Sequence, residues 1–132
     1  MEIVVSNQVS HVPVTIFQVK GEISAASYEQ LQQQAQDAFK AGMRNLILDL
    51  TDVTIVSSAG LRAIHSIFTL LQAAFPEESA EAIHKGMKEG TFKSSHLKLV
   101  RPTRHVRETL KMAGYDMFLE IHPNQQEAIA SF

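Results

Sequence analysis

NLILDLTDVTIVSSAGLRAI, residues 45–64, predicts a buried strand that leads directly into an amphipathic helix. The mainly apolar run Leu46–Leu50 is typical of a buried strand, and Val53–Val56 continues it. From about Ala59, apolar residues recur at intervals of three and four, which is the period of a helix with one buried face. That face carries Leu61, Ile64, Phe68, Leu71 and Phe75. Two serines and a glycine join the strand to the helix.

The rest of the chain alternates strands and helices in the same way. Further strands are expected at residues 3–5, 12–19, 96–100 and 117–121, with a turn at Ser6–Gln8 and with Gly21 ending the second strand. Further helices are expected between Ser27 and Gly42, between Pro102 and Gly114, and between Asn124 and Ser131. Ser24 or Ser27 can cap the first of these, because Ser27 and Gln30 have the spacing of a capping box, and Asn124 with Glu127 repeats that pattern in the last. Strands joined by a helix run parallel, but the first two strands have no helix between them. The pattern therefore predicts an α/β domain with a mixed sheet of about four to five strands.

One domain is expected to occupy the whole chain, residues 1–132, because domains most often have about 100–150 residues. Residues 76–95 are polar and contain two glycines, Gly86 and Gly90, so we interpret them as an inserted excursion with at most one short helix. In the second strand, Val12, Val14 and Ile16 alternate on one face and Phe17 and Val19 lie on the other, which is typical of a strand.

Composition excludes several classes of function. The net charge of −2 gives no electrostatic basis for binding nucleic acid or an anionic membrane. Cysteine is absent, which excludes disulfides, thiol catalysis and zinc–thiolate sites. No apolar run approaches the roughly 20 residues of a membrane-spanning helix, and the first residues do not have the pattern of a signal peptide. A cytoplasmic location is therefore expected.

No catalytic, cofactor or metal site is expected. The six histidines form no pair at the spacing of metal ligands on one helix, and neither a nucleophile elbow nor a phosphate-binding glycine loop is present. A local basic cluster near the C-terminus is best interpreted as a solvated face, with an acidic partner surface as the alternative. Its members are Lys98, Arg101, Arg104, Arg107 and Lys111.

The serine pair has two interpretations on residue chemistry alone. Either Ser57 or Ser58 caps the helix, and Gly60 packs tightly against a neighbour, which is the commoner arrangement. Alternatively, a hydroxyl there receives a phosphate, or the hinge binds an anion. The unpaired N–H groups and the partial positive charge of a helix N-terminus favour negative charge at this position.

The sequence resembles the STAS family of anti-sigma factor antagonists. The stretches that carry the resemblance are VKGEISAASYEQL, NLILDLTDVTIVSSAGLRAI and MAGYDMFLEIHPNQQEAIASF, and the resemblance extends over nearly the whole chain except residues 76–95. In the central stretch the residues in register with the family pattern are Asp49, Asp52, Val53, Ser58, Gly60 and Leu61. The resemblance implies a single STAS-like domain whose helices pack mainly on one face of the mixed sheet.

The resemblance also implies a site and a mechanism. In the family, the serine two residues before the glycine accepts a phosphate, and here that residue is Ser58. Residues expected to contact a partner are Ser24, Ser57, Ala59, Gly60, Arg62 and His65. The family pattern has aspartate at the positions of Ser24 and Ser57. The implied protein is a bacterial transcription regulator rather than an enzyme. When unphosphorylated, it binds a kinase-type anti-sigma factor, and a serine phosphatase restores that form.

Two other functions remain open from the sequence. One is a small-ligand or nucleotide sensor that binds an anion at the N-terminus of the helix near Ala59 without covalent change. The other is a scaffold subunit of a signalling complex, in which residues 76–95 supply the additional contact. Neither alternative depends on phosphorylation of Ser58.

Overall fold

A mixed five-stranded sheet lies at the centre of the computed structural model, which describes residues 1–75 and 93–132. The strands are β1 (Glu2–Val9), β2 (Pro13–Ile23), β3 (Leu46–Val56), β4 (Leu97–Val100) and β5 (Glu120–His122). They lie side by side in chain order. Strand β1 pairs antiparallel with β2, and each later pair is parallel. The predicted mixed α/β sheet is confirmed.

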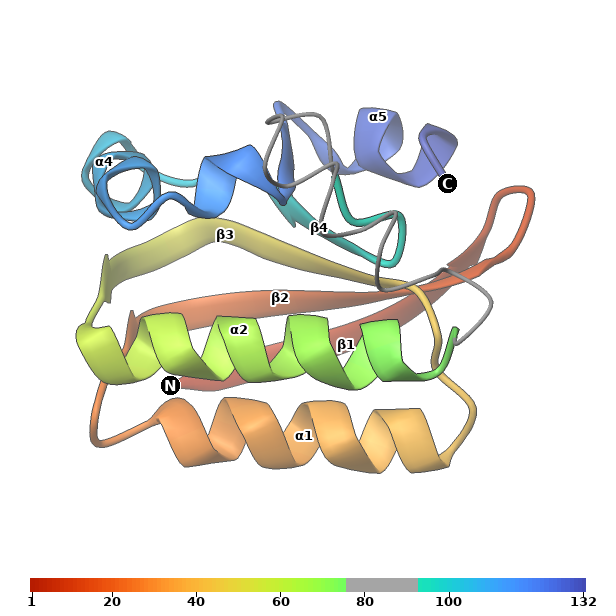
Figure 1. The fold of residues 1–132 in the computed structure, drawn as a ribbon, viewed down its shortest axis with the longest axis horizontal. Helices are drawn as coiled ribbons and strands as arrows, with labels where there is room; N and C mark the ends of the chain where they lie inside the picture. Colours follow the sequence, from red (N-terminus) through yellow and green to blue (C-terminus); the bar gives the residue numbers. More distant parts are fainter. Residues whose placement is uncertain (76–92) are drawn as a thin grey trace.

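The helices lie mainly on one face of the sheet, as expected. They are α1 (Tyr28–Lys40), α2 (Ser58–Ala73), α4 (Arg104–Met112) and α5 (Gln125–Ala130). Each parallel connection moves one strand in the same direction, and right-handed crossovers then place their helices on the same face. Helices α1 and α2 lie side by side along the strands, and α5 lies near the C-terminus (Figure 1).

Two apolar clusters cover the two faces of the sheet. The larger cluster contains Phe17 and Val19 of β2 together with buried side chains of α1, α2 and α4. The smaller cluster contains Val14 and Ile16 of β2 and is covered by Ala128 of α5. The alternation predicted for the second strand therefore separates the two clusters, because successive side chains of a strand point to opposite faces.

The first two strands are longer than predicted. Strand β1 continues through Ser6–Gln8, which was expected to form a turn, because these residues pair with β2. The chain turns instead at Ser10–Val12, where the Ser10 N–H donates to the Val12 carbonyl at 3.1 Å. Gly21 was expected to end β2. Instead, the chain forms a bulge there, with φ +103° at Gly21 and a register shift between Gly21 and Glu22, and the strand continues to Ile23.

The last strand was predicted at Met117–Ile121, and this prediction was wrong by several residues. Gly114 ends α4 in a left-handed conformation, with φ +80°, and residues Tyr115–Met117 then form a single 3₁₀ turn, η1. Phe118 and Leu119, which follow it, are both buried in the larger cluster. Their N–H groups donate back to the Tyr115 carbonyl, at 3.3 Å and 3.0 Å, instead of pairing with β4, so β5 begins only at Glu120.

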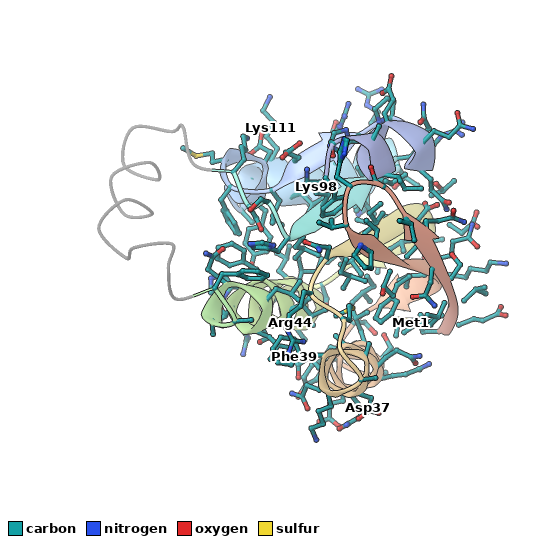
Figure 2. All side chains as sticks on the ribbon, turned by 90° about the vertical axis from the view of Figure 1, so that its right-hand side faces the viewer. Met1, Asp37, Phe39, Arg44, Lys98 and Lys111 are labelled. Atoms are coloured by element: carbon teal, nitrogen blue, oxygen red, sulfur yellow. The ribbon has the colours of Figure 1, made fainter. Side chains whose placement is uncertain are left out.

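Backbone hydrogen bonds and one side-chain contact fix the end of α1. The N–H groups of Gly42 and Met43 donate to the carbonyls of Phe39 and Ala38, both at 3.0 Å, which is the Schellman arrangement. Gly42 has φ +112°, as the predicted helix end requires. The guanidinium of Arg44 lies 3.9 Å from the centre of the Phe39 ring, and Figure 2 labels both residues beside α1.

The predicted excursion at residues 76–95 lies largely outside the described residues. Its last three residues, Lys93–Ser95, are described, and Ser94 is buried with its N–H donating to the Phe118 carbonyl at 2.8 Å. On the preceding side, the Phe75 ring stacks on His96 with 3.6 Å between ring centres. Among the helices described, none is both long and apolar enough to cross a bilayer.

Candidate phosphorylation and partner-binding site

The ends of β2 and β3 meet at the N-terminus of α2. Ile23 lies opposite Val56 in the parallel pairing, and the Ser57 N–H donates to the Ile23 carbonyl at 2.9 Å. Ser24 directly follows Ile23, so two loops that are distant in the sequence lie side by side here. The structure thus brings Ser24 next to the serine hinge, as the resemblance implied.

Ser57 is the N-cap residue of α2. Its backbone is extended, with φ −82° and ψ 178°, and its hydroxyl accepts a hydrogen bond from the Gly60 N–H at 3.3 Å. Its carbonyl accepts from the Leu61 N–H at 2.8 Å. The Ser57 hydroxyl therefore satisfies one of the N–H groups that a helix N-terminus leaves without intrahelical partners, and its carbonyl accepts the first hydrogen bond of the helix.

Ser58 is the first residue of α2, and its side chain is exposed. Within the part of the chain that the structure describes, its hydroxyl makes no hydrogen bond. The predicted helix start within two residues of Ala59 and the surface position of this serine are both confirmed. The two hydroxyls thus differ in role, because one caps the helix while the other points to solvent at its positive end.

The electrostatics at the start of α2 favour an added negative charge. The first turn contains no acidic residue, so the partial positive charge of the helix is not offset by a carboxylate there. Arg62 lies four residues after Ser58, which places both side chains on the same face of the helix, and it is exposed. A phosphate on Ser58 would lie near unpaired N–H groups and within one turn of a guanidinium.

Gly60 allows α2 to approach β2 closely. A Cβ at this position would lie 2.2 Å from the Ile23 carbonyl oxygen, well inside any normal contact. Gly60 is buried. It was expected among the residues that contact a partner, and in the structure it holds the hinge close against β2. Ala59, beside it, is half-buried.

His65 lies on the exposed side of α2, one turn beyond Leu61. Its ring lies within 5.9–6.4 Å of the ring centres of Phe68, Tyr115 and Phe118, so it forms the outer part of an aromatic cluster. The Tyr115 hydroxyl donates to the Leu61 carbonyl at 2.9 Å, and burial raises the pKa of Tyr115 above its usual 10.0. Sequence analysis missed this cluster, because its members come from separate elements.

Ser24 organises the loop that faces the hinge. Its hydroxyl accepts from the Ala26 N–H at 3.4 Å, and its carbonyl accepts from the N–H groups of Ser27 and Tyr28. Ser27 was expected to cap α1 through its side chain with Gln30. Its hydroxyl instead accepts from the Ser24 N–H at 3.0 Å and donates to the Glu22 carbonyl. The loop is therefore held by its own hydroxyls.

A further residue near the site was not predicted. Ile55, opposite Glu22 in the strand pairing, is 40% exposed on the face of the sheet away from α2. β4 pairs with β3 only as far as Asp49, so the later part of β3 has an open edge. The register shift of the sheet places Val53 and Val56 inside and Ile55 outside, and a simple alternation rule cannot find such a position.

The basic cluster is not a single surface. Lys98 is 2% exposed, and its Nζ contacts Glu120 Oε2 at 3.3 Å and the Ser131 hydroxyl at 2.8 Å, under the ring of Phe132. The expectation of a solvated cluster was therefore wrong for Lys98. In residues 1–75 and 93–132, no group of three or more His, Cys, Asp or Glu side chains is placed to hold a metal ion.

Comparison with known proteins agrees with this geometry. A model of the STAS domain matches residues 4–74, more than half of the chain. Similar solved structures include a candidate anti-sigma factor antagonist of Thermotoga maritima, with 20% identity and a TM-score of 0.69. An anti-sigma factor antagonist of Mycobacterium paratuberculosis has 18% identity and a TM-score of 0.69. The antagonist SpoIIAA in its unphosphorylated form has 12% identity and a TM-score of 0.64.

These three likenesses extend over most of both chains. They cover 88%, 98% and 96% of this chain and 84%, 93% and 93% of the respective structures. At these identities they establish the fold. A comparison with curated protein sequences gave no match. The match of the family model over the hinge, together with the shared fold, establishes that this chain belongs to the STAS domain family.

Proposed function

We propose that this chain is an anti-sigma factor antagonist that acts in the bacterial cytoplasm and is switched by phosphorylation of Ser58. The observation that carries the proposal is that the two serines of the hinge have different roles. Ser57 uses its hydroxyl to cap α2, whereas the hydroxyl of Ser58 is exposed and has no partner among the described residues. A kinase could therefore modify Ser58 without removing the cap of the helix.

The names of the structural neighbours support this choice of function. Two of them are called anti-sigma factor antagonists, and SpoIIAA has been solved in both an unphosphorylated and a phosphorylated form. The corresponding partner of this chain is an anti-sigma factor that is also a serine kinase. It transfers the γ-phosphoryl group of ATP to the Ser58 hydroxyl, releasing ADP and a proton, and a serine phosphatase hydrolyses the ester.

Charge is the physical basis of the switch. A phosphoserine carries about −1.5 to −2 charges at neutral pH, and an interface must either desolvate or repel that charge. A penalty of about 2.8 kcal/mol weakens binding about a hundredfold, and no change of fold is required. Ser24 and Ser57 replace the aspartates of the family pattern. The unphosphorylated hinge therefore lacks the two carboxylates of the family pattern, so a phosphate on Ser58 adds negative charge where none of these positions carries it.

The partner surface surrounds this hinge. Arg62 and His65 extend it along the exposed side of α2, and Ser24 and Ala59 form its other border. Ser57 and Gly60 contribute by fixing the start of α2 relative to β2 rather than by offering a large contact area. Binding is therefore expected to be sensitive to side chains at Ser24 and Arg62.

Titration calorimetry with the serine-kinase anti-sigma factors of the source organism tests the proposal. Ser58→Ala should bind one of them with wild-type affinity and remain bound in the presence of ATP, whereas Ser58→Asp should bind at least tenfold more weakly. Ser57→Ala is the matched control, because it changes the neighbouring hydroxyl and should still accept a phosphate. Equal affinity of Ser58→Ala and Ser58→Asp would mean that the serine pair only shapes a turn.

A further inference from the structure

A second surface of the domain has the properties of a binding site and is separate from the serine hinge. It is a cleft of about 480 Å³ between α4 and the edge of the sheet. Its walls are formed by Arg107 and Lys111 of α4, by Lys93 and Asp116, and by residues 119–122, which include the whole of β5. One wall is therefore the edge strand β5, and the opposite wall carries the cations of α4.

Among residues 1–75 and 93–132, no strand covers the side of β5 that faces away from β4. β5 is the last strand of the sheet, and in the described parts of the chain no strand pairs with its outer side. The Arg101 N–H donates to the His122 carbonyl at 2.9 Å, so the backbone of His122 faces β4. Because backbone groups alternate in direction along a strand, the N–H and carbonyl of Ile121 face the open side.

The cleft also has an excess of positive charge. Arg107 and Lys111 are exposed and form no ion pair within residues 1–75 and 93–132, and Lys111 lies at the outside of the molecule in Figure 2. The Lys93 ammonium donates to the Asp116 carbonyl oxygen. Of the two carboxylates in the cleft, Glu120 is already balanced by the buried ammonium of Lys98. The unpaired cations therefore favour an anionic ligand.

We propose that this cleft binds an extended acidic segment of another protein, which adds to β5 as a sixth strand. Arg107 and Lys111 are four residues apart on α4, which corresponds to about 6 Å along the helix. Alternate residues of a strand lie about 6.6 Å apart on one face. Two carboxylates at alternate positions of the bound segment therefore match the two cations, while Ile121 supplies the backbone hydrogen bonds.

The short length of β5 explains why charge is required. Of the three residues of β5, only Ile121 directs its backbone groups away from β4. Its N–H and carbonyl can form two hydrogen bonds with an added strand, and backbone pairing gives no more than these two. Such a short edge also protects the protein from pairing with itself. Selectivity therefore depends on the alternating carboxylates, and this binding is independent of the state of Ser58.

Nuclear magnetic resonance titration of the full chain tests the proposal. The probe is an acetylated and amidated peptide, Thr-Glu-Thr-Glu-Thr, and the control is Thr-Glu-Glu-Thr-Thr, which has the same composition but carries its glutamates on opposite faces of a strand. The alternating peptide should shift the Ile121 amide and bind at least fivefold more tightly than the control. Failure of the alternating peptide to bind, or equal affinity for both peptides, would overturn the proposal.

Variants identify the cations that are responsible. Arg107→Glu with Lys111→Glu should weaken binding of the alternating peptide at least tenfold. Arg104→Glu is the matched control, because Arg104 is on the same helix but pairs with Glu108 and does not line the cleft. This variant should change the affinity for the alternating peptide by less than twofold. Ser58→Asp should also bind like the wild type. Retention of binding by the double variant, or competition by inorganic phosphate at equal concentration, would show a non-specific or simple anion site instead.

Discussion

Replacing Gly60 by alanine tests whether the hinge is held by close packing of α2 against β2. The added methyl group would lie 2.2 Å from the Ile23 carbonyl oxygen and 3.0 Å from the Ile23 carbonyl carbon. A real Cβ contact is never shorter than about 3.0 Å, so α2 or β2 must move by at least about 0.8 Å. The obstructing atoms belong to the backbone of a buried strand, which cannot rotate away as a side chain can.

The expected loss of stability follows from three terms. Overpacking of a close contact costs about 1–3 kcal/mol, and the upper end applies because backbone must move. The same movement disturbs the hydrogen bond from the Ser57 N–H to the Ile23 carbonyl, at a cost of about 1 kcal/mol. Alanine offsets about 1 kcal/mol through its better helix propensity. Gly60→Ala should therefore destabilise the domain by about 3 kcal/mol.

Thermal and urea unfolding measure this change. A loss of about 3 kcal/mol corresponds to a fall of about 12 °C in Tm for a domain of this size. Gly114→Ala is the matched control, because Gly114 has φ +80° but no atom within 4 Å of the added methyl, so only backbone strain of about 1 kcal/mol is expected. A Gly60→Ala variant that is as stable as the wild type would refute the packing role.

Three further predictions concern single side chains. Ser57→Ala should lower stability by about 1 kcal/mol through loss of the cap, whereas Ser58→Ala should change it by less than about 0.5 kcal/mol in the same urea titration. Lys98→Ala should destabilise by about 2 kcal/mol, because it leaves Glu120 without its buried partner, and Lys98→Met should recover part of that loss by keeping the apolar stem. Burial raises the pKa of Tyr115, so the folded state holds the phenolic proton more tightly than the unfolded state does. The resulting contribution to stability is complete below pH 10 and is lost as the pH rises through the folded-state pKa. Tyr115→Phe has no such proton and should therefore lose stability less steeply in alkaline unfolding curves.

The order of elements and the position of the hinge were predictable because local chemistry determines them. The apolar run of β3, the period of α2 and the serine cap act within a few residues of one another. The cap at Asn124 was predicted for the same reason, and its side chain accepts from the Glu127 N–H at 2.8 Å. The presence of a strand or helix can therefore be predicted from the sequence wherever residues close together in the chain determine it.

Features that depend on partners distant in the sequence were not predictable. Turn-forming residues Ser6–Gln8 lie in a strand because β2 pairs with them, and the Asn7 side chain accepts from the Thr15 hydroxyl at 3.1 Å. Lys98 is buried because Glu120 and Ser131 surround it from two other elements. Nothing near these residues in the sequence indicates such contacts.

The position of the hinge was predicted, but which of its two serines caps the helix was not. Both hydroxyls of the hinge are equivalent in sequence terms, since either serine can cap a helix that begins near Ala59. The backbone at Ser57 determines the choice, because its extended conformation directs its hydroxyl to the Gly60 N–H. The aromatic cluster around His65 depends on η1, which no local pattern indicates.

Mass spectrometry of the protein purified from its native cells tests the central claim most directly. Trypsin cleaves after Arg44 and Arg62, which yields one peptide, residues 45–62, that contains the whole hinge. Fragment ions that separate Ser57 from Ser58 locate the modification. We expect a fraction of this peptide to carry one phosphate on Ser58 and none on Ser57. A phosphate confined to Ser57, or a peptide without phosphate under every growth condition sampled, would contradict the account.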